Sequence, residues 1–162
     1  MNPTQRTRLH RAGWFISIAA LVGAGAFAIM WILAPADPRA DPTDPRQVAL
    51  GAKIYARECA SCHGKRLEGQ PEWHQRKPNG RLPAPPHDAN GHTWHHPDAE
   101  LFKLTKLGLA PFAGADYRTD MPSFEDKLAD EEIWAALAYI KSTWPQDIRA
   151  RQDLRDRAAR NR

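Results

Sequence analysis

The two cysteines of this 162-residue chain, Cys59 and Cys62, stand three positions apart, and His63 follows at once. Residues of these types can form a thiol redox pair, a metal site, a disulfide, or the attachment point of a prosthetic group. A C-x-x-C redox pair is typical of a βαβ surrounding, and a structural zinc site needs four ligands. A disulfide across two residues would add little stability. The pattern therefore favours an attachment point.

The sequence C-x-x-C-H is the signature of c-type haem attachment. In that chemistry both thiols bond the porphyrin, and the adjacent imidazole of His63 reaches the iron from one face. The loop over residues 64–97 is too long to be structureless in a compact domain unless it wraps something. We therefore predict one haem c, attached through Cys59 and Cys62, which also replaces part of the missing core.

The haem motif lies at the end of a predicted helix. Asp44 and Pro45 are of the types expected at the N-cap and the first helical position. Gly64 is expected to end this helix. Its apolar positions follow helical spacing, and they are Val48, Ala52, Tyr55 and Cys59.

Two further helices are predicted after the long loop. The first begins with Asp98 as its cap. The second begins with Asp130 as its cap and ends before Pro145, so Lys141 would lie near the negative end of its dipole. No segment alternates with period two for long, so no sheet is predicted. The predicted fold class is all-α, with about three main helices in the haem domain and one N-terminal transmembrane helix.

Residues 44–145 resemble the class I cytochrome c family. The resemblance rests on GAKIYARECASCHG, which is similar to the family's first helix and haem motif, and on TDMPSFEDKLADEEIWAALAYI, which is similar to its distal-methionine segment and last helix. It implies that Gly51 and Tyr55 on the first helix pack against Ala136 and Tyr139 on the last.

The resemblance also implies a set of haem-binding residues, namely Cys59, Cys62, His63, Met121 and either Pro85 or Pro86. His63 would be the proximal iron ligand and Met121 the distal one, and a thioether ligand raises the reduction potential. A proline carbonyl would accept a hydrogen bond from the second ring nitrogen of His63. Both prolines suit this role, and the sequence does not choose between them.

The long loop offers rival ligands, either for the sixth position of the iron or for a separate metal ion, and these are His74, His87, His92, His95 and His96. A packed, hydrogen-bonded loop is the favoured interpretation of residues 87–96, and no further role is predicted for it. Four other side chains could reach the haem propionates or only pack or face solvent, and they are Arg81, Trp94, Tyr117 and Arg118.

The N-terminal segment has no charged residue from Ala12 to Ala36, a run long enough to cross a membrane. We predict a cytoplasmic N-terminus (residues 1–12), an uncleaved transmembrane helix (residues 13–35) and a proline-rich linker (residues 36–43). The excess of arginine before the apolar run places the N-terminus in the cytoplasm. A signal peptide cleaved near Ala34–Ala36 is the competing interpretation, and both interpretations export the rest of the chain.

The net charge of +4 is concentrated at the two ends of the chain. Residues 44–145 hold 13 basic and 14 acidic residues. The basic tail, residues 146–162, holds six basic and three acidic residues. A nucleic-acid partner is not expected, because the domain itself has no basic excess. The tail is predicted to be solvated or frayed, and a basic patch resting on anionic lipid or on a partner is the alternative.

The sequence thus predicts a mono-haem electron carrier, anchored in a bacterial inner membrane with its haem domain on the periplasmic side. An enzyme is not expected, because two axial ligands leave the iron no open position for a substrate. The alternatives are a haem-bearing subunit of a larger oxidase or dehydrogenase complex, and a catalytic or sensing haem with a labile sixth ligand. The expected partners are the lipid bilayer and membrane or periplasmic electron donors and acceptors. The sequence does not identify these proteins, and it does not predict an oligomeric state.

Overall fold

The computed structural model describes residues 39–114 and 116–161. The predicted anchor (residues 13–35) and the first part of the predicted linker lie outside these ranges. The described residues form helices joined by turns and irregular segments, with no β-strand among them, which agrees with the all-α prediction. Within the same ranges, no helix is both long and apolar enough to cross a membrane.

The first helical run carries the cysteines and consists of three segments: α2 (Pro45–Ile54), the π-helical turn η1 (Tyr55–Cys59) and α3 (Ala60–His63). Asp44 caps it as predicted, because its Oδ1 accepts a hydrogen bond from the backbone N–H of Arg46 at 2.8 Å. Gly64 follows the last turn with φ of 82°, a backbone conformation that favours glycine. The π-turn that ends at Cys59 was not predicted, since apolar spacing does not distinguish it from an α-turn.

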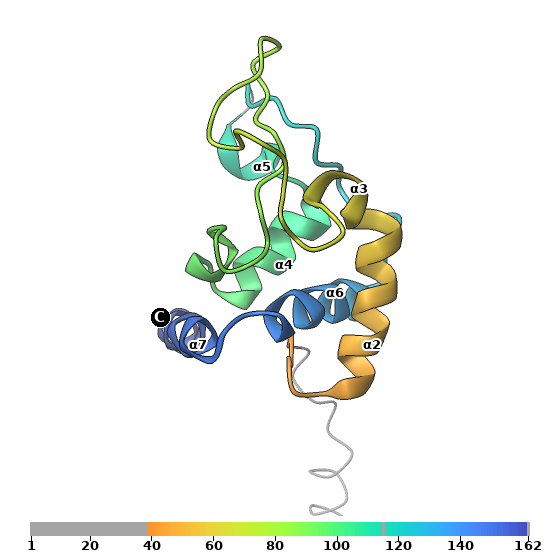
Figure 1. The fold of residues 1–162 in the computed structure, drawn as a ribbon, viewed down its shortest axis with the longest axis vertical. Helices are drawn as coiled ribbons and strands as arrows, with labels where there is room; N and C mark the ends of the chain where they lie inside the picture. Colours follow the sequence, from red (N-terminus) through yellow and green to blue (C-terminus); the bar gives the residue numbers. More distant parts are fainter. Residues whose placement is uncertain (1–38, 115, 162) are drawn as a thin grey trace, which may run out of the picture. The chain divides into compact units, whose positions relative to one another are not determined.

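Helix α2 packs against α6 (Asp130–Ser142), and Figure 1 shows the two helices crossing. A Cβ atom on Gly51 would lie only 1.9 Å from the carbonyl oxygen of Ala135, so only glycine permits this approach. One turn later, the rings of Tyr55 and Tyr139 lie 5.4 Å apart. The predicted contact between the first and last helices is therefore present, although Gly51 lies against Ala135 rather than Ala136.

Helix α4 (Asp98–Leu107) packs against α6, and the short helix α5 (Ala110–Ala113) contacts α4. The rings of Phe102 and Trp134 stack with their centres 4.3 Å apart.

The packing of the helices and loops forms two buried apolar clusters. The α4 cluster comprises Ala40, Ile54, Leu101, Phe124, Leu128, Ile133, Trp134, Ala136, Leu137 and Ala138. The haem-motif cluster comprises Tyr55, Leu67, Ile140 and Trp144.

The charged residues at two helix ends do not have the roles that the sequence suggested. Asp98 is the first residue of α4 rather than its cap, and its buried carboxylate accepts hydrogen bonds from Lys141 Nζ at 2.9 and 2.8 Å. Lys141 is therefore an ion-pair partner and not an exposed charge at a helix end. Asp130 likewise follows the cap of α6, which is Ala129, and Glu132 accepts the backbone N–H of Ala129 at 3.0 Å.

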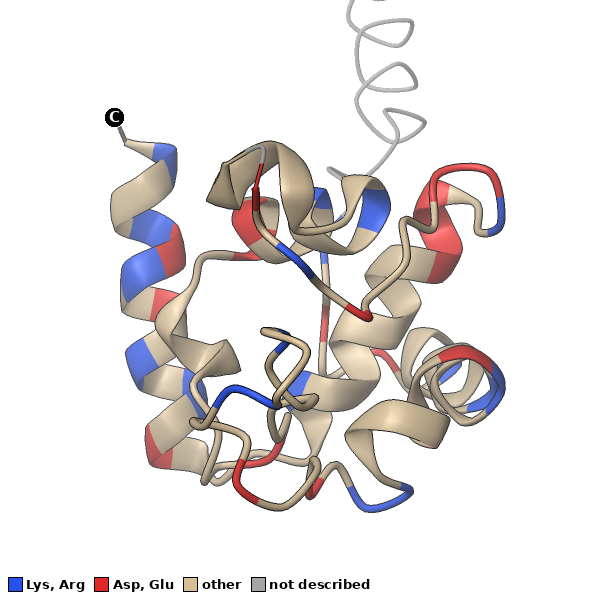
Figure 2. Cartoon of the chain, turned by 90° about the horizontal axis from the view of Figure 1, so that it is seen from above, with Lys and Arg blue, Asp and Glu red and all other residues tan. Residues whose placement is uncertain are grey.

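The prediction of a frayed tail was wrong, because residues Gln146–Arg160 form helix α7. Gln152 and Asp156, four positions apart, face inward and are buried. Gln152 Nε2 donates to Asp98 Oδ1 at 2.7 Å, and the backbone N–H of Asp98 donates to Asp156 Oδ1 at 3.0 Å. Basic and acidic residues follow one another along the rest of α7 (Figure 2). Polar contacts therefore dock a helix that has little apolar surface to bury.

The long loop folds back toward the haem motif. The backbone N–H of Gly69 donates to the carbonyl of His63 at 2.8 Å, and that of His87 donates to the carbonyl of Leu67 at 2.8 Å. The loop then enters a single 3-10 turn, η2 (Thr93–His95), before α4. Trp144, between α6 and α7, donates its indole N–H to the carbonyl of His87 at 2.7 Å. These bonds fix the path of the loop beside the cysteines.

Candidate functional site

The three residues of the Cys-x-x-Cys-His motif lie on one continuous helical run. Cys59 ends η1 and is partly buried against the haem-motif cluster, whereas Cys62, in α3, is exposed. Burial, together with the nearby Glu58 and Cys62, raises the pKa of the Cys59 thiol to about 11. At neutral pH this thiol is protonated, which is unlike a cysteine prepared for redox exchange.

His63 is buried, with 8% of its surface exposed, and its Nδ1 lies 2.8 Å from the carbonyl oxygen of Pro85. A carbonyl only accepts, so Nδ1 must carry the hydrogen and Nε2 keeps its lone pair. Burial lowers the pKa of His63, and the bond to Pro85 opposes this shift in part. A neutral imidazole with one nitrogen anchored and the other free is the form that binds a metal.

The geometry distinguishes the two prolines that the sequence left open. The carbonyl of Pro85 takes the hydrogen bond from His63. Pro86 instead packs against two glycines of the loop, Gly69 and Gly91, where an added Cβ would come within 2.5 and 2.0 Å of its backbone atoms. The haem-binding role of Pro85 remains a prediction, but its contact with the histidine is direct.

His87 stands beside His63, a relationship that the sequence did not reveal. The two rings stack with their centres 4.0 Å apart and their planes 22° apart. His87 Nδ1 lies 2.8 Å from Thr93 Oγ1. Its burial, together with the nearby His63 and His92, holds the pKa of His87 well below its usual value. Imidazoles on opposite faces of one iron would have ring centres roughly 6 Å apart, given metal–nitrogen distances near 2.0 Å. At the observed 4.0 Å, His87 is therefore a packing neighbour of His63 and is not placed to bind the same iron as a second ligand.

Met121, the predicted distal ligand, is half-buried and packs against the α4 cluster. Its backbone N–H donates to Thr119 Oγ1 at 3.0 Å. The preceding Asp120 forms ion pairs with Lys77, at 3.3 Å, and with Arg81. The Met121 segment is thus tied to the long loop. Arg81, which was a candidate for a propionate, is held by this carboxylate, and ligation by Met121 remains a prediction.

Trp94 packs against the same haem-motif cluster as Cys59. Its indole Nε1 is buried and has no hydrogen-bond partner among the residues that the structure describes. Arg155 of α7 lies over the ring, 5.4 Å from its centre. Because a buried N–H without an acceptor is costly, the indole has the chemistry to bind an acceptor that the chain itself does not supply. A haem propionate is such an acceptor, so the residues here fit the predicted cofactor.

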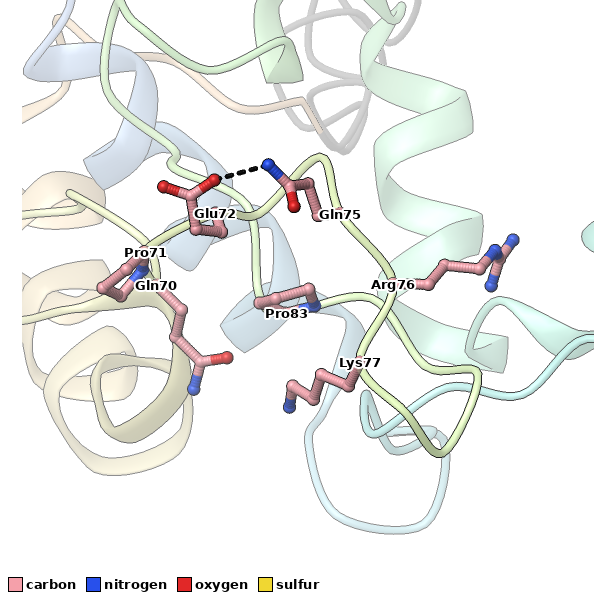
Figure 3. A pocket seen from close by; sticks show the side chains of 7 residues that line it. All are labelled: Gln70, Pro71, Glu72, Gln75, Arg76, Lys77 and Pro83. Atoms are coloured by element: carbon pink, nitrogen blue, oxygen red, sulfur yellow. Dashed lines mark hydrogen bonds between the residues drawn. The ribbon is translucent and has the colours of Figure 1, made fainter.

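The remaining two candidates for a propionate lie elsewhere. Tyr117 has the guanidinium of Arg76 over its ring at 5.7 Å, and Arg118 is exposed. A separate open pocket is formed by the long loop itself, and Figure 3 shows its lining of Gln70, Pro71, Glu72, Gln75, Arg76, Lys77 and Pro83. Gln75 Nε2 donates to Glu72 Oε2 there at 2.7 Å. None of the predicted haem-binding residues lines this pocket, so it is not the haem site.

One known protein family matches the chain. The family model described as "Cytochrome c" matches residues 48–144, which is well over half of the chain. The matched segment includes the Cys-x-x-Cys-His motif, Pro85 and Met121, and it ends before α7. No curated protein and no solved structure matches the chain.

Proposed function

The chain belongs to the cytochrome c family, and on this premise we propose that it carries single electrons between redox partners by means of one covalently attached haem c. The observation that carries the proposal is the 2.8 Å contact between His63 Nδ1 and the Pro85 carbonyl. It leaves Nε2 of a buried, neutral imidazole free, one residue after Cys62 on the same helical run. When bound, haem c supplies a one-electron Fe(III)/Fe(II) couple.

Each residue of the chain has a distinct part in this function. Cys59 and Cys62 would hold the porphyrin through thioether bonds, and His63 would bind the iron from Nε2. Met121 would bind it through sulfur, which favours the reduced state and raises the potential. The indole N–H of Trp94, which lacks a partner among the described residues, would donate to a propionate. Burial of His63 would limit the access of water to the iron on that side.

The test begins with the full chain, produced in cells that attach haem c. After denaturation, haem should remain on the wild-type chain and be lost from a Cys59→Ser, Cys62→Ser double variant. The oxidised protein should show the weak near-infrared sulfur-to-iron band, and Met121→Ala should abolish the band and lower the potential. Absence of covalent haem would refute the attachment. Absence of the band, with carbon monoxide binding to the reduced wild type, would refute Met121 ligation and favour a labile sixth position.

We also propose that residues 13–35 anchor the protein in the inner membrane, with the haem domain in the periplasm. The support is the uncharged run from Ala12 to Ala36 and the three arginines before it. The haem should fractionate with membranes and require detergent for release, and a variant that starts after residue 37 and carries a cleavable export signal should be soluble. Haem found in the soluble fraction of wild-type cells would contradict the anchor. Other proteins that remain bound in mild detergent would indicate a complex subunit instead of a separate carrier.

A further inference from the structure

A pair of histidines in the long loop has no part in the proposed haem site. His92 immediately precedes the 3-10 turn η2 and His96 immediately follows it. Their ring centres lie 5.6 Å apart, with the ring planes at 66°. Solvent reaches both residues, since His92 is exposed and the His96 side chain is 31% exposed. One short turn therefore holds two accessible imidazoles close together.

Neighbouring side chains orient both rings. Glu100 Oε1 lies 3.0 Å from Nδ1 of His96, and an ionised carboxylate only accepts, so Nδ1 carries the hydrogen and Nε2 keeps its lone pair. The Trp73 ring stacks with His92 at 5.4 Å between centres and 15° between planes, and with His74 at 3.5 Å. A carboxylate on the second nitrogen is the usual support of a metal-bound histidine.

The separation of the two rings suits one shared ion. Two imidazoles bound at metal–nitrogen distances of about 2.0 to 2.1 Å have ring centres roughly 4.5 to 6.5 Å apart, depending on the angle between them. The observed 5.6 Å falls within this range.

We propose that His92 and His96 bind one divalent transition-metal ion of the copper or zinc class, separate from the haem iron, with Glu100 as a positioning residue for His96. In the part of the chain that the structure describes, no three or more His, Cys, Asp or Glu side chains converge to hold a metal. The two imidazoles are therefore the protein ligands, and water completes the coordination. Imidazole ligands suit both metals, and Cu²⁺ is expected to bind more tightly than Zn²⁺.

The test is a calorimetric titration of the chelator-treated, haem-loaded full chain with Cu²⁺, and then with Zn²⁺, at neutral pH. We expect one ion per chain, bound more weakly by His92→Gln and by His96→Gln. Glu100→Gln should lower the affinity about tenfold or more, as loss of a supporting carboxylate typically does. Electron paramagnetic resonance of the Cu²⁺ form should show coupling to two imidazole nitrogens.

The matched control is His95→Gln, because this neighbouring ring packs on Trp94 instead, at 3.8 Å. It should bind Cu²⁺ as the wild type does, and the haem spectrum checks that each variant is folded. The proposal is overturned if the wild type binds no ion stoichiometrically, or if a His92→Gln, His96→Gln double variant binds as well as the wild type. Because the titration measures the added ion, its result is independent of whether the haem carries electrons.

Discussion

Replacing Lys141 by methionine should destabilise the protein far more than removing an exposed lysine that forms an equally short ion pair. The side chains of Lys141 and Asp98 are each only 4% exposed, and Nζ donates to both carboxylate oxygens at 2.9 and 2.8 Å. Lys141→Met keeps the length of the stem but leaves the Asp98 charge buried, with Gln152 as its remaining side-chain donor. Removing one partner of a buried pair costs about 3–5 kcal/mol.

The matched control is Lys106→Met. Lys106 Nζ lies 2.7 Å from Asp130, but those side chains are 28% and 51% exposed, so water solvates the charge that is left behind. Loss of this ion pair should lower the free energy of unfolding by about 0–1 kcal/mol. Urea unfolding of the full chain, followed by far-ultraviolet circular dichroism, measures both free energies of unfolding.

A second substitution identifies the cause. If the cost comes from an unpaired buried charge, Asp98→Asn should recover part of the stability that Lys141→Met loses, because a neutral amide is cheaper to bury. A loss below about 1 kcal/mol for Lys141→Met, or a double variant no more stable than that single variant, would refute the reasoning.

Three further outcomes are expected. Gly51→Val should lower the free energy of unfolding by at least about 1–3 kcal/mol, because its Cβ would lie 1.9 Å from a carbonyl oxygen of α6. Urea titration measures this change, and a variant as stable as the wild type would contradict the packing. The Arg81 guanidinium holds the pKa of Asp120 below its usual value, so this ion pair stabilises the protein above about pH 4 and is lost as the pH falls through the lowered pKa. The difference in unfolding midpoint between the wild type and Asp120→Asn should therefore vanish in acid, and a difference that persists there would exclude this cause. Trp94→Phe should lower the reduction potential in a redox titration, because the propionate loses its donor and its negative charge then favours Fe(III); an unchanged potential would show that the indole only packs.

Several features of the site were predictable because they depend on residues close together in the sequence. The C-x-x-C-H spacing places both thiols and the imidazole on about one turn of helix, whatever surrounds it. Asp44 marks the start of that helical run because its side chain caps the helix. Gly64 marks the end because glycine readily adopts the positive φ found there. The absence of two-residue periodicity predicted the all-α class, which the described residues show.

Lys141 and α7 were misassigned because their contacts join distant segments. Lys141 follows Leu137 by four positions and Trp134 by seven, so it lies on the apolar face of α6, and this spacing was the available signal. The partner that neutralises it, Asp98, lies 43 residues earlier in the chain. Gln152 and Asp156 dock α7 through hydrogen bonds with Asp98, and no hydrophobic pattern in the sequence reports such contacts.

By itself, the sequence determined the C-x-x-C-H motif that predicts haem attachment, since this signature needs only two thiols and an imidazole at fixed local spacing. The tertiary structure decided which carbonyl orients His63, because Pro85 lies 22 residues away and its position depends on the folded path of the loop. It also decided that His87 stacks on His63 and that His92 pairs with His96. Five similar histidines in one loop have no distinct roles until packing gives each ring different neighbours, and those neighbours come from segments far apart in the chain.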